Sequence, residues 1–249
     1  MPRLKPEERL IVALDTDTLA EAEAIVKKLV PKGVDHFKVG LGLFTETGPE
    51  AIRMVRRHGG RVFPDLKFHD IPNTAAHAVR SAVRWGVWMT NLHLFGGAAM
   101  AREALAAARA ESARQKGTAS LLVGVTVLTS MDDAALSALG IRRGAREQAL
   151  HLAKMAKSAG LAGVVASPQE AAAIRRACGA GFLIVTPGVR PAGDASWKED
   201  QKRVATPSAA VAAGADYIVV GRPITQAEDP SEAAERIIQE LEGNAHATE

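Results

Sequence analysis

The sequence predicts one α/β domain, a (β/α)8 or TIM barrel, over residues 1–249. Short apolar runs alternate with amphipathic segments, the pair occurs eight times, and no linker or composition break divides the chain. Strict alternation of strand and helix implies a parallel sheet. Eight units in 249 residues suit a barrel better than a doubly wound sheet of five or six strands.

The expected strands are apolar runs of the length typical of strands buried on both faces. They are Leu10–Asp15, His36–Gly40, Arg61–Lys67, Met89–Leu94, Ser120–Thr126, Gly163–Ala166, Phe182–Thr186 and Tyr217–Val220. Segments rich in Ala, Glu, Lys and Arg follow them with helical spacing, at 19–30, 47–58, 71–85, 98–116, 145–160, 168–178, 207–214 and 230–242. Pro72, Pro168 and Pro207 stand where first-turn prolines belong.

Two stretches are expected to be irregular. Gly188–Thr206 is rich in Gly, Pro, Asp and Lys and is too long for a simple connector, which indicates a mobile active-site loop; the alternative is a plain surface excursion. Residues 243–249 are expected to fray as a tail.

Composition excludes several classes of protein. The 47% hydrophobic and 24% charged residues are those of a globular chain rather than a disordered one. One cysteine, Cys178, excludes an internal disulfide framework and a cysteine-rich metal site, and we interpret it as a buried apolar residue. The net charge of +3 is small and interspersed, so the basic segments 53–61 and 142–146 indicate solvated surface rather than nucleic-acid binding.

Membrane and secretory signals are not apparent in the sequence. No run approaches the roughly 18–20 apolar residues that span a bilayer. Residues 1–8 are charged, unlike a signal peptide. We therefore expect a cytoplasmic protein.

Polar residues collect where the expected strands end, which is where active sites of such barrels lie. Strand alternation places Asp65 and Lys67 on one face, points Lys38 into the barrel and puts Asp15 at the top of the first strand. Lysine and aspartate are seldom buried unless paired, so these groups predict an alternating charge network at the barrel mouth. The alternative is an ion-pair lattice that only closes the barrel.

The last strands indicate a phosphate site. Gly221-Arg222-Pro223 follows the eighth strand, and loops after strands seven and eight commonly bind phosphate in this fold. Arg222 would add a charge-assisted contact.

The remaining candidates are weaker. Asn91 and His93 lie on the fourth strand, where His93 is a candidate supporting residue, and the histidines lack metal-ligand spacing. No glycine-rich nucleotide loop is present, so neither a dinucleotide nor ATP is expected.

The segment Asp65-Leu66-Lys67-Phe68-His69-Asp70-Ile71-Pro72-Asn73-Thr74 resembles the signature of the orotidine 5′-phosphate decarboxylase family, in its bacterial form. The similarity runs nearly end to end. It includes 14–15, 37–40, 125–130, 186–191, 200–203 and 216–223.

This resemblance implies decarboxylation of orotidine 5′-monophosphate (OMP) to UMP and CO2, the last step of de novo pyrimidine synthesis, without a metal or organic cofactor. It implies a homodimer with shared active sites. Its implied catalytic residues are Lys38, Asp65, Lys67 and Asp70, with Lys67 as the proton donor to C6 and Asp70 from the partner subunit.

The resemblance also implies the substrate contacts. Asp15 and Lys38 would hold the ribose, and Thr129 would lie near the pyrimidine. Thr74 would reach the ribose side from the partner, and Ile71 is a further substrate-binding residue. The implied phosphate ligands are Arg190, Gln201, Gly221 and Arg222.

Two alternatives remain open. A magnesium-dependent sugar-phosphate decarboxylase or aldolase of the same barrel type shares an Asp-x-Lys-x-x-Asp pattern and a phosphate site after strand eight; its activity would be lost to a chelator. A non-catalytic ligand sensor on the same barrel would need a broken charge network, whereas every member is present here.

Overall fold

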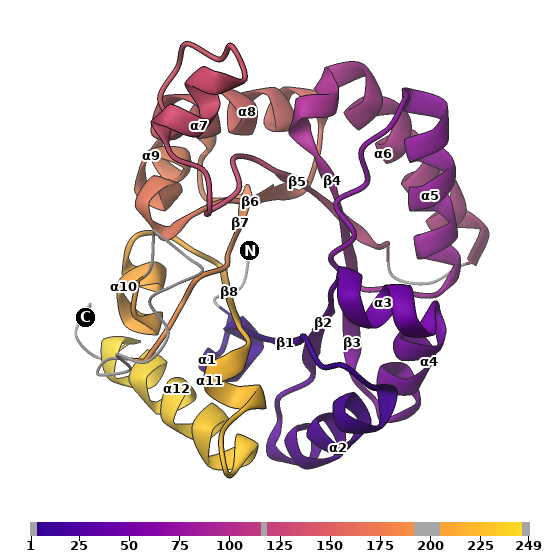
Figure 1. Ribbon diagram of the computed structural model, residues 1–249, viewed down its shortest axis with the longest axis vertical. Helices are drawn as coiled ribbons and strands as arrows, with labels where there is room; N and C mark the ends of the chain where they lie inside the picture. Colours follow the sequence, from indigo (N-terminus) through magenta and orange to yellow (C-terminus); the bar gives the residue numbers. More distant parts are fainter. Residues whose placement is uncertain (1–3, 116–118, 192–204, 246–249) are drawn as a thin grey trace.

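The computed structural model describes residues 4–115, 119–191 and 205–245 and contains the expected barrel. A ring of strands is surrounded by helices (Figure 1). The strands form one eight-stranded sheet in the order β3-β2-β1-β8-β7-β6-β5-β4, and each pair of neighbours in this order is parallel. The predicted fold class is therefore confirmed.

The strands lie where the apolar runs predicted them. Their bounds are β1 Leu10–Leu14, β2 His36–Val39, β3 Arg61–Pro64, β4 Met89–His93, β5 Leu121–Val125, β6 Gly163–Val165, β7 Leu183–Thr186 and β8 Tyr217–Val220. Most differ from the prediction by one residue at an end. The exception is β3, which we expected to reach Lys67; Pro64 has no N–H to continue a ladder, and Lys67 leaves the extended region with φ of 49°.

The helices that follow the strands also match the prediction. They are α2 Leu19–Leu29, α4 Glu50–Arg57, α5 Pro72–Arg84, α6 Gly97–Gln115, α8 Ala145–Ala159, α9 Pro168–Cys178, α10 Pro207–Ala212 and α12 Pro230–Ala245. Local chemistry sets their starts: Thr18 and Glu21 form a capping box on α2, and Ser167 caps α9 before Pro168. Because α12 continues to Ala245, the first residues of the expected tail are helical; 246–249 lie outside the described residues.

Short helices fill several connections between the expected strands and helices. They are α1 Pro6–Arg9, α3 Leu41–Thr47, α7 Asp133–Ala138 and α11 Arg222–Thr225, with the 3-10 turns η1 Val30–Lys32 and η2 Leu94–Gly96. Such pieces are too short to show a clear helical period in the sequence. The α3 helix follows Gly40 directly and buries only Leu43.

The apolar core has two layers. Inside the barrel, Ile11, Phe63 and Met89 pack with residues from β5, β7 and β8. Outside the sheet, larger apolar clusters fill the space between strands and helices. Along β1, Ile11 and Ala13 belong to the inner cluster, whereas Leu10, Val12 and Leu14 belong to an outer one, so the predicted alternation is confirmed.

The barrel closes between β3 and β4, the two ends of the strand order. Single contacts join them here: the Trp88 N–H donates to the Val62 carbonyl at 3.0 Å and the His93 N–H to the Phe68 carbonyl at 2.9 Å. The Thr90 hydroxyl donates to the Pro64 carbonyl at 3.2 Å. Backbone groups and the Thr90 side chain thus both take part in closing this seam.

Within the described residues, no helix combines the length and the apolar character needed to cross a membrane. The cytoplasmic location expected from the sequence stays a prediction.

Candidate active site

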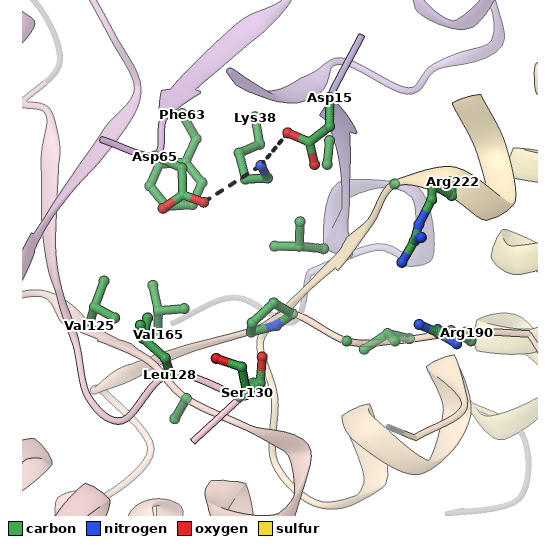
Figure 2. Close-up of a pocket in the computed structure, with 18 of the residues that line it drawn as sticks. Asp15, Lys38, Phe63, Asp65, Val125, Leu128, Ser130, Val165, Arg190 and Arg222 are labelled. Atoms are coloured by element: carbon green, nitrogen blue, oxygen red, sulfur yellow. Dashed lines mark hydrogen bonds and ion pairs between the residues drawn. The ribbon is translucent and has the colours of Figure 1, made fainter. Parts of the chain in front are cut away.

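A cavity of about 590 Å³ opens at the carboxyl ends of the strands. Its lining residues come from nearly every strand end, and Figure 2 shows how they divide. Asp15, Lys38 and Asp65 lie together on one side, and the guanidinium groups of Arg190 and Arg222 lie well apart from Asp65. This is the end of the barrel at which the sequence placed its polar residues.

An alternating chain of ion pairs forms one wall. The Lys38 ammonium lies 2.9 Å from Oδ1 of Asp15 and 3.6 Å from Oδ2 of Asp65. Oδ1 of Asp65 in turn lies 2.9 Å from Nζ of Lys67. The order is therefore Asp15, Lys38, Asp65, Lys67, with each inner charge held between two opposite ones.

Burial differs along this chain of charges. The side chains of Lys38 and Asp65 are 11% and 14% exposed, whereas those of Lys67 and Asp15 are 31% and 55% exposed. Gly40 allows the close approach at the Asp15 end, because a Cβ there would lie 2.6 Å from Oδ1 of Asp15 and 3.1 Å from Nζ of Lys38. The inner two charges are thus enclosed, and Lys67 keeps a face toward the cavity.

Lys67 has an unusual backbone. Its φ of 49° lies in the left-handed region, which among the described residues it shares only with glycines. This conformation costs a non-glycine residue about 1–2 kcal/mol. Asn91 supports it: the Asn91 side-chain carbonyl accepts a 2.8 Å hydrogen bond from the Lys67 N–H, and its amide donates to Oδ1 of Asp65 at 2.6 Å. The sequence predicts Asn91 on the fourth strand but does not identify it as a site residue.

A second part of the cavity is apolar. Val125, Val165 and Leu128 lie together in Figure 2, near Ser130. Thr129 also lines the cavity. Neither valine is predicted from the sequence as a site residue, because a valine at a strand end has the same local pattern as any core valine.

The third part is cationic. Arg190, Gly221 and Arg222 all line the cavity, as does Gln226, which the sequence analysis missed. Gly188 and Arg190 are tied to Ala205 by two backbone hydrogen bonds, from the Arg190 N–H and from the Ala205 N–H. The two described ends of the expected 188–206 loop therefore meet beside the cavity; residues 192–204, and Gln201 with them, lie outside the described residues.

Comparisons with known proteins agree on the family. The model of the "Orotidine 5′-phosphate decarboxylase / HUMPS family" matches residues 8–237. The chain belongs to this family. A curated orotidine 5′-phosphate decarboxylase from Moorella thermoacetica is 54% identical over 97% of this chain and 95% of its own, and one from Syntrophotalea carbinolica is 51% identical over 96% of each.

Solved structures give the same result. The crystal structure of orotidine 5′-phosphate decarboxylase from Lactobacillus acidophilus has a TM-score of 0.82 and 38% identity, covering 93% of this chain and 98% of that one. The enzyme from Pyrococcus horikoshii has a TM-score of 0.74 and 26% identity, covering 94% and 99%. The similarity to decarboxylases of this family thus extends over the whole barrel.

Three residues that the decarboxylase resemblance assigns to the active site, two of them from a partner subunit, lie apart from this cavity. Asp70, Ile71 and Thr74 are exposed, with Ile71 67% exposed, and none of these three described residues lines the cavity. The Asp70 carboxylate accepts a 2.6 Å hydrogen bond from the Ile71 N–H. Their assignment to the active site, and that of Asp70 and Thr74 to a partner subunit, stays a prediction.

His93 lies beside Lys67 on the decarboxylase barrel. Its ring stacks on that of His69 at 5.5 Å, and its Nδ1 accepts a 3.5 Å hydrogen bond from the Phe95 N–H. Burial, together with the charges of His69 and Lys67, lowers the pKa of His93 from 6.5 to about 4. His93 is therefore neutral at physiological pH and adds no second cation next to Lys67.

Among the described residues, no group of three or more His, Cys, Asp or Glu is placed to hold a metal ion. The acidic groups of the cavity that belong to the charge network face lysines instead.

Proposed function

We propose that this protein converts OMP to UMP and CO2, the last step of de novo pyrimidine synthesis. The observation that carries the proposal is the Asp15–Lys38–Asp65–Lys67 ion-pair chain, which lies in the same cavity as Arg190 and Arg222. The membership of the decarboxylase family and the names of its relatives support it.

The three parts of the cavity suit the three parts of a nucleotide. Arg190 and Arg222 would bind the phosphate with charge-assisted hydrogen bonds, together with Gly221 and Gln201. Asp15 and Lys38 would hold the ribose hydroxyls. The pyrimidine would then lie near Thr129, between the apolar wall and the charge network.

The reaction breaks the bond between C6 and the carboxylate. The electron pair of that bond stays on C6, where no π-system is aligned to accept it. A cation fixed beside C6 stabilises the developing negative charge, and such fixed electrostatics are usually the largest catalytic contribution. Lys67 would supply this cation and then donate a proton from Nζ to C6, so that one residue serves two roles.

Asp65 holds the Lys67 ammonium in place. A carboxylate 2.9 Å from an ammonium attracts it and restricts its position. Phosphate binding far from C6 would provide binding energy for closing the 188–206 segment over the substrate and expelling water.

The active site would be completed by a second copy of the chain. In the proposed homodimer, the partner supplies its Asp70, Ile71 and Thr74, and its Asp70 would become the fourth member of the catalytic set with Lys38, Asp65 and Lys67. The exposure of these three residues in a single chain supports this arrangement.

The test is a direct assay. Chelator-treated protein is mixed with OMP, the loss of OMP absorbance is followed, and the product is identified as UMP. We expect full turnover without added metal. Absence of UMP, or activity that appears only with Mg²⁺ and a sugar phosphate, would overturn the proposal in favour of the related sugar-phosphate enzymes.

A further inference from the structure

Asn91 occupies the middle of β4, between the seam of the barrel and the charge network. It is 0% exposed and pairs in register with Val123 of β5. Its strand neighbour Met89 belongs to the inner core, whereas Leu92 belongs to an outer cluster. The period of two along a strand therefore turns Asn91 toward the barrel interior.

A fully buried amide is costly unless both of its ends are hydrogen-bonded. Asn91 meets this requirement with two groups of the proposed catalytic site, the Asp65 carboxylate and the Lys67 N–H. The contacts fix the amide orientation. The reverse orientation would place its oxygen against a carboxylate and its N–H group against an N–H donor.

Each of these contacts restrains a different part of the charge network. Oδ1 of Asp65 receives both the Asn91 amide at 2.6 Å and the Lys67 ammonium at 2.9 Å, so the amide fixes the acceptor at which Lys67 points. The second contact holds the Lys67 backbone in its left-handed conformation, at a point where β3 has already ended. Strained conformations persist where surrounding contacts hold them.

We propose that Asn91 is a positioning residue that sets the Lys67 ammonium for proton transfer by holding the Asp65 carboxylate and the Lys67 backbone together. This inference rests on the proposed decarboxylase function. Asn91 acts through Asp65 and Lys67, and it does not line the cavity where the substrate would bind. Its removal therefore affects the chemical step more than nucleotide binding.

The experiment compares three variants by kcat and KM for OMP, by the Kd for UMP, and by urea unfolding. Asn91→Ala removes both contacts, and we expect kcat to fall about 100-fold, as for a reacting group displaced by about 1 Å, with KM and Kd within about threefold. Asn91→Asp keeps an oxygen that can accept the Lys67 N–H, but it places a second carboxylate against that of Asp65. We expect its loss of kcat to equal or exceed that of Asn91→Ala.

Thr90→Val is the matched control. Thr90 is also 0% exposed on β4 and also closes the seam, through its hydrogen bond to Pro64, but it touches neither Asp65 nor Lys67 by its side chain. We expect a comparable shift of the urea midpoint with kcat within about threefold of the wild type.

The outcomes separate the two proposals. If the wild type does not convert OMP, the proposed function fails. If the wild type is active and the Asn91 variants lose no more kcat than Thr90→Val, or lose kcat and nucleotide affinity equally, the positioning role fails. Should Asn91→Ala not fold, Asn91→Asp, which has nearly the same size, decides the matter by the same criteria.

Discussion

The two ends of the barrel have opposite characters. At the amino ends of the strands, the His36 ring packs 4.2 Å from Trp88, and Trp88 packs 5.1 Å from Tyr217, which fills the barrel with aromatic side chains. At the carboxyl ends, the interior opens into a cavity of about 590 Å³ with charged residues on its wall.

The ion pairs at the two ends of the barrel also differ in their surroundings. At the amino end, Asp35 lies 2.8 Å from His36 and 3.2 Å from Arg61. Burial alone would raise the pKa of Asp35, but the nearby His36 ring and the Arg61 guanidinium outweigh it and hold the pKa below its usual value. At the carboxyl end, Lys67 is paired on one side and faces the cavity on the other. An ion pair that borders no cavity can contribute only to stability, whereas an ion pair beside a cavity leaves one charged group able to contact a bound molecule.

The largest effect is expected for Lys67→Ala at the cavity end. The cation and proton donor are both lost, so turnover of OMP should fall at least about 10⁴-fold. The free energy of unfolding should change by less than about 1 kcal/mol, because Asp65 keeps Asn91 and Lys38 as partners. Steady-state kinetics and urea unfolding measure the two effects, with the exposed Lys154→Ala as control. Near-normal turnover would contradict the proton-donor role.

The amino end should respond in the opposite way. Ile11 lies on β1, and Asp15 directly follows the last residue of that strand. Both side chains face the inside of the barrel, but Ile11 is 0% exposed within the inner core, whereas Asp15 lines the cavity. Ile11→Ala should lower the free energy of unfolding by about 2–5 kcal/mol through the cavity it leaves, with kcat per folded molecule within about threefold. Asp15→Ala should instead lower kcat and leave the free energy of unfolding nearly unchanged. Equal losses of kcat in the two folded variants would mean that the ends are not functionally separate.

Arg222→Ala tests the cationic side of the cavity. Loss of a charge-assisted contact should weaken UMP binding by about 10- to 100-fold. Uridine, which has no phosphate, is the matched ligand, and its affinity should be the same for wild type and variant. Calorimetric titration measures both affinities, and an unchanged Kd for UMP would remove Arg222 from the phosphate site.

The smallest expected effect concerns His93. Its folded pKa of about 4 lies below the unfolded value of 6.5, so between these values the unfolded state binds more protons and stability falls as the pH falls. His93→Gln should reduce the loss of unfolding free energy between pH 7 and pH 4.5 by about 1–2 kcal/mol.

Urea unfolding at several pH values measures this effect, with the exposed His151→Gln as control. A variant that loses stability as steeply as the wild type would show that His93 is not the group responsible.

Sequence reasoning predicted the barrel, its eight strands and the inward direction of Lys38, because the hydrophobic period of a strand is a local property. It also placed Asp65 and Lys67 together. It failed at the end of β3 and at α3 and α7, since a left-handed lysine and a helix of one or two turns have no distinct period.

The local pattern alone therefore establishes which residues face the interior and at which end of the barrel they collect. It does not establish which of them touch. The pairing of Lys38 with Asp15 and of Asn91 with Asp65 joins residues more than twenty positions apart. The first contact depends on the pairing of β1 with β2, and the second depends on the closure of the barrel between β3 and β4. Strand pairing and closure bring these elements together, and only there do the buried Asn91 amide and the enclosed charges of Lys38 and Asp65 find the partners that their burial requires.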